Sequence, residues 1–142
     1  GWHMLEDLHN FDNKEWEIAG SARRFECGSP NMTGIHALHA SLSLILETGL
    51  QTIEEQILDN TRFMIDYLLQ LPDRYQLITP TAEQRHAGIV TFRPLNETPE
   101  SLFEILGTEN VFCALRGGGI RFSPHFYTPR KRLFKALELL DG

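Results

Sequence analysis

Apolar residues recur at the spacing of amphipathic helices in two segments of the first half of the chain. From Met32 onward they lie three and four positions apart, and Gly49 follows where a helix would stop. The second helix is predicted to open with the T-x-x-E capping box of Thr52 and Glu55 and to end before Pro72. The pattern therefore predicts two consecutive helices.

After Pro72 the pattern changes to short runs of β-branched and aromatic residues. YQLIT at 75–79 is interpreted as a strand, with the end of a loop as the alternative, and AGIVTFRP at 87–94 is a stronger strand pattern. VFCAL at 111–115 and IRFS at 120–123 flank three glycines, which predicts a β-hairpin. These runs predict a sheet of three to four strands.

Two further helices are predicted among these strands. Thr98 and Thr128 are each followed by a proline, the pattern of an N-cap residue with proline at the first helical position. The first of these helices is expected to end near Leu106, and the second to close the chain. The order of elements predicts an α+β fold, with a mostly antiparallel sheet and helices packed on one face.

The first thirty residues show no clean hydrophobic period, unlike the rest of the chain. We interpret residues 1–30 as an irregular connector with a short helical turn, and residues 31–142 as one small α+β domain. The chain begins with Gly-Trp and has its first methionine at position 4, so we expect it to be a piece of a longer protein.

Composition narrows the classes of partner. A net charge of -6 argues against a nucleic-acid-binding groove, because phosphate binding requires clustered cations, and the basic turn at 130–132 is too small to provide one. No apolar run is long enough to span a membrane. With Cys27 and Cys113 as the two cysteines, the sequence does not read as a disulfide framework, and we expect a cytoplasmic location.

Three features of the sequence carry weak chemical signals. His36 and His39 lie three apart on the first predicted helix, but no Cys or carboxylate cluster joins them, so we favour a surface pair and predict no metal site. Cys113 lies in an apolar strand pattern and is interpreted as a small buried hydrophobe. The three glycines match neither the phosphate-loop nor the dinucleotide spacing, so they are interpreted as a turn.

Two features carry stronger signals. Ser29, in the segment CGSPN, precedes a helix whose backbone N–H groups could bind an anion, although a plain loop is the alternative. Arg121 lies in the second strand of the hairpin, where its guanidinium could bind a carboxylate by two hydrogen bonds. The alternative for Arg121 is a surface arginine paired with a glutamate.

Together these segments resemble a known family. ARRFECGSPNMTGIHAL at 22–38 resembles the R-R-F-E-x-G-[ST]-P-N segment of class V aminotransferases, which are pyridoxal-phosphate (PLP) enzymes that include the cysteine desulfurases. AGIVTF at 87–92 resembles the family's S-G-I-V-S-F strand, and LRGGGIRFSPHFYT at 115–128 resembles its R-x-G-x-[LI]-R-x-S-P-H-x-Y-N run. The three matches follow the family's order.

The resemblance implies the C-terminal part of a fold type I PLP enzyme, a homodimer that acts on an amino-acid substrate. Residues 1–30 would then connect to a large domain. Ser29 matches the position that reaches the cofactor phosphate of the neighbouring subunit. Arg121 matches the arginine that binds the substrate α-carboxylate, and Arg116 matches the arginine that opens the hairpin, with a substrate-side or structural role.

The chain also departs from the family pattern. None of its three lysines, Lys14, Lys131 and Lys135, has the context of the family's Schiff-base lysine, so we expect this chain alone to be inactive. The hairpin lacks the cysteine of the desulfurase loop, so desulfurase chemistry is not expected, while transamination, kynureninase-like cleavage and epimerase-like chemistry stay open. Thr128 replaces the family's Asn and is interpreted as a helix cap. A stand-alone, non-catalytic α+β ligand-binding or regulatory module is the alternative reading.

Overall fold

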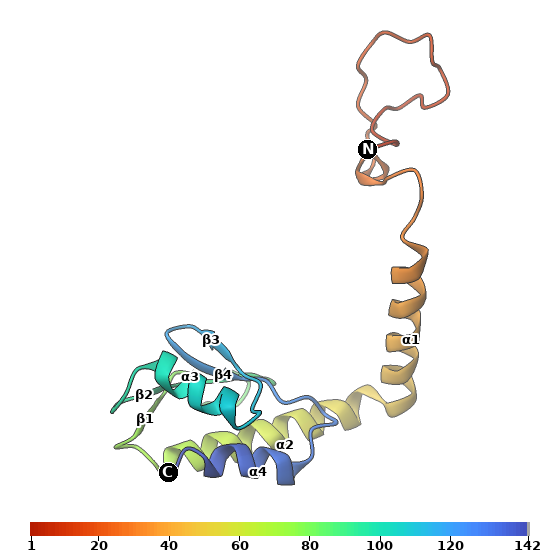
Figure 1. Ribbon diagram of the computed structural model, residues 1–142. Coiled ribbons are helices and arrows are strands. Elements are labelled where there is room, and N and C mark those ends of the chain that lie inside the picture. Colours follow the sequence, from red (N-terminus) through yellow and green to blue (C-terminus); the bar gives the residue numbers. More distant parts are fainter. Residues whose placement is uncertain (142) are drawn as a thin grey trace. The chain divides into compact units, whose positions relative to one another are not determined.

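The contacts in the chain cluster in two units, Gly1–Glu47 and Thr48–Gly142, in a computed structural model that describes residues 1–141 (Figure 1). The predicted boundary between residues 30 and 31 separates a connector from a domain. The contacts show which residues cluster, and they do not test that division. That boundary stays a prediction.

The N-terminal unit contains little regular structure before its single long helix. An isolated antiparallel bridge joins Leu5 to Ile18, and the 3-10 helix η1 spans Ala22–Phe25. Helix α1 then spans Met32–Thr48, as the hydrophobic spacing predicted. The side-chain Oδ1 of Asn31 accepts a hydrogen bond from the Gly34 backbone N–H at 2.9 Å and so caps the helix.

The C-terminal unit consists of three helices and a four-stranded sheet. Its elements are α2 (Leu50–Leu69), β1 (Tyr75–Leu77), β2 (Val90–Pro94), α3 (Pro99–Thr108), β3 (Ala114–Arg116), β4 (Gly119–Phe122) and α4 (Arg130–Glu138). The strands lie in the order β1-β2-β4-β3, and all three pairings are antiparallel. The predicted α+β fold class is confirmed.

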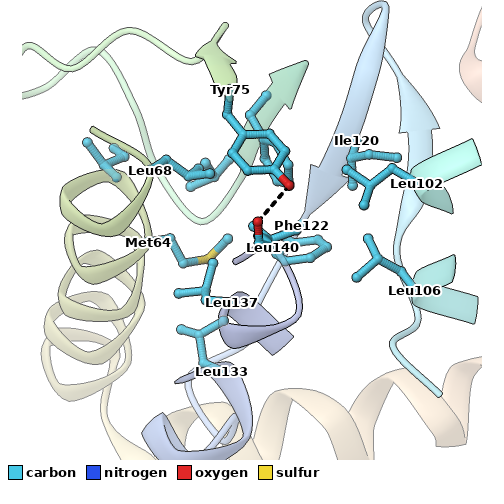
Figure 2. Packing of buried hydrophobic residues seen from close by; sticks show 13 residues of the cluster. Met64, Leu68, Tyr75, Leu102, Leu106, Ile120, Phe122, Leu133, Leu137 and Leu140 are labelled. Carbon is cyan, nitrogen blue, oxygen red and sulfur yellow. Dashed lines mark hydrogen bonds between the residues drawn. The ribbon is translucent and has the colours of Figure 1, made fainter. Parts of the chain in front are cut away.

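All three helices pack against the same face of the sheet. Side chains alternate along β2 and β4, so every second residue is buried under the helices. The buried strand residues are Val90, Phe92, Ile120 and Phe122. Facing them are Met64, Ile65 and Leu68 of α2, Leu102 and Leu106 of α3, and Leu133, Leu137 and Leu140 at the C-terminal end (Figure 2). The Tyr75 hydroxyl donates to the Leu140 carbonyl at 2.9 Å, which satisfies its polar tip inside this core.

The three glycines form the predicted turn, two of them because of their backbone conformation and the third because of a close backbone approach. Gly117 and Gly118 are the two loop residues between β3 and β4, with φ values of 63° and 75°. Two consecutive positive φ values are the geometry of a type I′ hairpin, which residues with side chains adopt at a cost. At Gly119, a Cβ atom would lie 2.2 Å from the Phe92 carbonyl oxygen, so only glycine allows β4 to approach β2 this closely.

The predicted capping box at Thr52 and Glu55 is wrong. Helix α2 begins at Leu50, and its N-cap is Gly49, three residues before Thr52, at a φ of 89°. Because glycine tolerates this left-handed conformation, the chain leaves α1 and enters α2 within a single residue. Thr52 therefore lies within the first turn of α2.

The predicted cap at Thr128 is also wrong, whereas the one at Thr98 is confirmed. The Thr98 side chain accepts a hydrogen bond from Ser101 N–H at 3.2 Å, with proline at the start of α3. Thr128 instead accepts from His125 N–H at 3.0 Å and holds the turn before α4. Its hydroxyl is thereby occupied, and Pro129 takes the N-cap position of α4.

Candidate functional site

The face of the sheet opposite the helices is polar and carries three arginines. Strand register places Arg121 beside Thr91 of β2 and Ala114 of β3, and places Gly119 beside Arg116. Arg93 follows Thr91 by two residues, so it shares this open face because side chains on one face recur every second residue. The strand positions of this face are Gln76, Thr91, Arg93, Ala114, Arg116, Gly119 and Arg121, and none of them is acidic. We call this surface the arginine face.

Arg121 is the central residue of the arginine face. It lies on β4 with a paired strand on either side, so its backbone is fixed by both ladders. Its side chain is half-buried, and its Nε atom is buried without a hydrogen-bond partner among residues 1–141. A buried donor without an acceptor is costly, so an oxygen atom from a ligand or a water molecule would stabilise the guanidinium at this position.

Arg93 braces the hairpin that carries the other two arginines. Its Nε donates to the Gly118 carbonyl at 2.7 Å. Its Nη2 lies 2.6 Å from the position that a Cβ atom on Gly118 would occupy, so the guanidinium lies directly against the turn. The alternation of AGIVTFRP puts Arg93 on the strand face opposite to Val90 and Phe92, but no local pattern marks it as a site residue, because only the pairing of β2 with β4 brings it to the hairpin.

The arginine face is not neutralised from within the described part of the chain. Within residues 1–141 an ion pair joins Arg130 to Asp59, and His3 Nδ1 lies 4.0 Å from a Glu26 carboxylate oxygen; neither contact involves the arginine face. The alternative that Arg121 pairs with a glutamate is therefore not what the structure shows. Arg116 is exposed at the end of β3, next to the turn.

Ser29 lies in the N-terminal unit, whereas the three arginines belong to the C-terminal unit. It is exposed, three residues before α1, and its hydroxyl has no hydrogen-bond partner among residues 1–141. The Asn31 side chain accepts from the Gly34 N–H, and the Met32 N–H donates to the Pro30 carbonyl at 2.8 Å, so part of the first turn of α1 is already capped. The role of Ser29 as a phosphate ligand stays a prediction.

The weak candidates from the sequence do not form a site. His36 and His39 are both exposed on α1, and within residues 1–141 no group of three or more potential ligands is placed to hold a metal. A hollow of about 800 Å³ lies between the first half of α2 and residues 83–88, but it contains none of the predicted site residues. No helix in the described range is both long and apolar enough to cross a membrane.

The two cysteines should differ in reactivity. Cys27 is exposed, whereas Cys113 is half-buried against the hydrophobic core, and this burial raises the pKa of its thiol. Because the thiolate is the reactive form, we expect Cys113 to react with a disulfide reagent such as DTNB at least about tenfold more slowly than Cys27 at pH 8. Cys27→Ser isolates the slow site, and urea should accelerate it. Equal rates in the folded chain would show that Cys113 is accessible and poised to react.

Comparison with known proteins shows which family the chain is similar to. The family model described as Aminotransferase class-V matches residues 3–126. An uncharacterized aminotransferase of Bacillus subtilis (strain 168), YcbU, is 29% identical over 121 residues, which are 82% of this chain and 30% of YcbU. The family-model match includes the loop before α1, the strand β2 and the hairpin.

Solved structures share the fold. The apo cysteine desulfurase of Thermococcus onnurineus NA1 superposes with a TM-score of 0.82 at 23% identity, over 99% of this chain and 37% of that one. The cystine C-S lyase C-DES, in complex with its product cysteine persulfide, has a TM-score of 0.75 at 22% identity with the same coverage. A C-DES mutant with glycine covalently linked to its PLP cofactor gives a TM-score of 0.77 at 21% identity, again over 99% and 37% of the two chains. The chain therefore spans about a third of the length of the relatives it matches.

Proposed function

Because this chain belongs to the class V aminotransferase family, we propose that it is the C-terminal part of a PLP-dependent enzyme that acts on an amino acid. The observation that carries the proposal is the buried, unpartnered Nε of Arg121 on a sheet face with no acidic strand residue. An α-carboxylate provides two coplanar oxygens, which is what a half-buried guanidinium lacks here. The family match supports an enzyme over the alternative of a non-catalytic binding module.

Arg121 would bind and orient the substrate. Its fixed backbone position and the braced hairpin give the guanidinium a defined direction, so two parallel N–H···O bonds would set the orientation of the α-carbon. Arg116, exposed at the end of the neighbouring strand, would add positive charge on the substrate side. Both arginines hold the substrate and align it; in this proposal neither of them transfers a proton.

The residues of the chain fit part of a PLP site. The exposed Ser29 hydroxyl before the 17-residue helix α1 is suited to the cofactor phosphate, across a dimer interface in the proposed assembly. When bound, PLP supplies an electron sink for charge that develops at the substrate α-carbon. The three lysines are all exposed, and exposed surface lysines are not suited to hold the cofactor covalently in a cleft. We therefore propose that this chain alone is inactive, and that the enzyme works as a homodimer in the cytoplasm.

The carboxylate site can be tested on the 142-residue chain itself. We expect L-alanine, but not L-alaninamide, to shift the Nε–H NMR signal of Arg121, because the amide lacks the carboxylate. Arg121→Lys keeps the positive charge but loses the two parallel N–H donors of the guanidinium. Arg132→Lys makes the same change at an exposed arginine of α4 and is the control. A hydrogen bond to a charged group contributes about 1.5 to 3 kcal/mol, so losing one of two parallel bonds in Arg121→Lys should weaken L-alanine binding roughly 10-fold or more.

A second arm tests the proposed inactivity. PLP followed by borohydride reduction should leave no stoichiometric pyridoxyl adduct in the mass spectrum of the chain. A single adduct on Lys14, Lys131 or Lys135 would contradict this part of the proposal. Equal binding of L-alanine and L-alaninamide, or unchanged binding by Arg121→Lys, would instead remove Arg121 from the substrate site.

A further inference from the structure

The arginine face holds more positive charge than one α-carboxylate requires. Arg93 and Arg116 lie on either side of Gly119, on the strands that flank β4, while Arg121 follows Gly119 by two residues. With strands about 4.8 Å apart and a rise of about 3.3 Å per residue, the three Cα positions surround a region roughly 10 Å by 7 Å. The central strand contributes no side chain at the Gly119 position.

The region around Gly119, between Arg93 and Arg116, is a second position for an anion on the arginine face. Its hydrogen-bond donors are available. Arg93 uses its Nε on the Gly118 carbonyl, which fixes the guanidinium, and within residues 1–141 its Nη groups have no recorded hydrogen-bond acceptor. Arg116 is exposed and likewise has no acceptor among these residues. One fixed and one adaptable guanidinium therefore flank the Gly119 position, next to the arginine that would hold the α-carboxylate.

The positive charge of the arginine face contrasts with the negative charge of the whole chain. The chain as a whole has a net charge of -6, yet the strand positions of the arginine face include three cations and no anion. Like charges collected on one face repel one another unless an anion joins them. A ligand that carries two negative charges would provide an acceptor both for the buried Nε of Arg121 and for the two arginines around Gly119.

We propose that the arginine face selects a substrate with a second acidic group on its side chain, an acidic amino acid of the size of aspartate or glutamate. This rests on the proposed function, since it assigns the α-carboxylate to Arg121. The side-chain carboxylate binds between Arg93 and Arg116, and Arg93 is the specificity-determining residue of the pair because Gly118 holds it in place.

The test compares ligands that differ in one charge. The labelled 142-residue chain is titrated with L-aspartate and with its isostere L-asparagine at constant ionic strength, and the Nε–H signals of Arg93, Arg116 and Arg121 are followed by NMR. A charge-assisted hydrogen bond is worth at least about tenfold in affinity, so we expect L-aspartate to bind at least about tenfold more tightly than L-asparagine. Both ligands should shift Arg121, and L-aspartate should also shift Arg93 and Arg116.

Variants separate the second position from the first. Arg93→Gln and Arg116→Gln should each reduce the affinity for L-aspartate much more than the affinity for L-asparagine, and the larger loss is expected for Arg93→Gln because Gly118 holds that guanidinium in place. Arg132→Gln, on α4 and away from the arginine face, is the matched control and should change neither. Because Arg116 is exposed at a strand end, its variant tests the site without disturbing the core.

The outcomes distinguish this inference from the proposed function. Equal affinity for L-aspartate and L-asparagine, with Arg121 shifted by both, would overturn the second position and leave the α-carboxylate site standing. No shift of Arg121 by either ligand would contradict the proposed function as well. Inorganic phosphate that binds as tightly as L-aspartate would show a general anion site and would overturn selection of acidic amino acids.

Discussion

Gly119→Ala is expected to destabilise the C-terminal unit by about 3 kcal/mol, because the added methyl group has no space between two paired backbones. Its Cβ would lie 2.2 Å from the Phe92 carbonyl oxygen and 2.8 Å from the Phe92 carbonyl carbon. Backbone atoms cannot rotate away as a flexible side chain can, so β4 must move from β2. The pairing that positions Arg121 would be lost with it.

The control for this variant is a glycine with free space around it. Gly107 lies in α3 and has no heavy atom within 4 Å of an added Cβ, so Gly107→Ala should stabilise the chain by roughly 0.5–1 kcal/mol through helix propensity. Urea unfolding followed by circular dichroism measures both. If Gly119→Ala unfolds at the wild-type midpoint, the close approach of β4 to β2 is not a constraint in solution.

Phe92→Ala is expected to cost about 3 to 5 kcal/mol, the range for removing a fully buried aromatic ring from a core. Phe92 is 0% exposed and packs edge-to-face between Tyr75 and Phe122, at centroid distances of 5.4 Å and 5.5 Å. Its removal would leave a cavity at the centre of the sheet and take away two aromatic contacts.

The matched control is the same substitution on the surface. Phe112 is 98% exposed, so Phe112→Ala should change the free energy of unfolding by no more than about 0.5 kcal/mol. Urea unfolding and near-UV circular dichroism report the loss of packing in Phe92→Ala. Two variants of equal stability would mean that the core shown in Figure 2 does not hold the unit together.

The features that could be predicted from the sequence are local ones. The limits of α1, the cap of α3 at Thr98 and the hairpin around the three glycines follow from interactions within a few residues, so spacing and turn residues predicted them. The same is true of the motifs that resemble the family, which identified Ser29, Arg116 and Arg121 as candidates before any fold was known. A single backbone conformation at Gly49 was enough to overturn the capping box at Thr52.

The tertiary structure decided what depends on distant pairing. The order β1-β2-β4-β3 brings residues about thirty positions apart into register, and no local pattern specifies which strand becomes the neighbour of β4. That pairing placed Arg93 against Gly118, left Nε of Arg121 buried without an acceptor, and collected three arginines on one face. The candidate residues came from the sequence; their assembly into one cationic surface depends on the close packing of backbones, which only the folded chain provides.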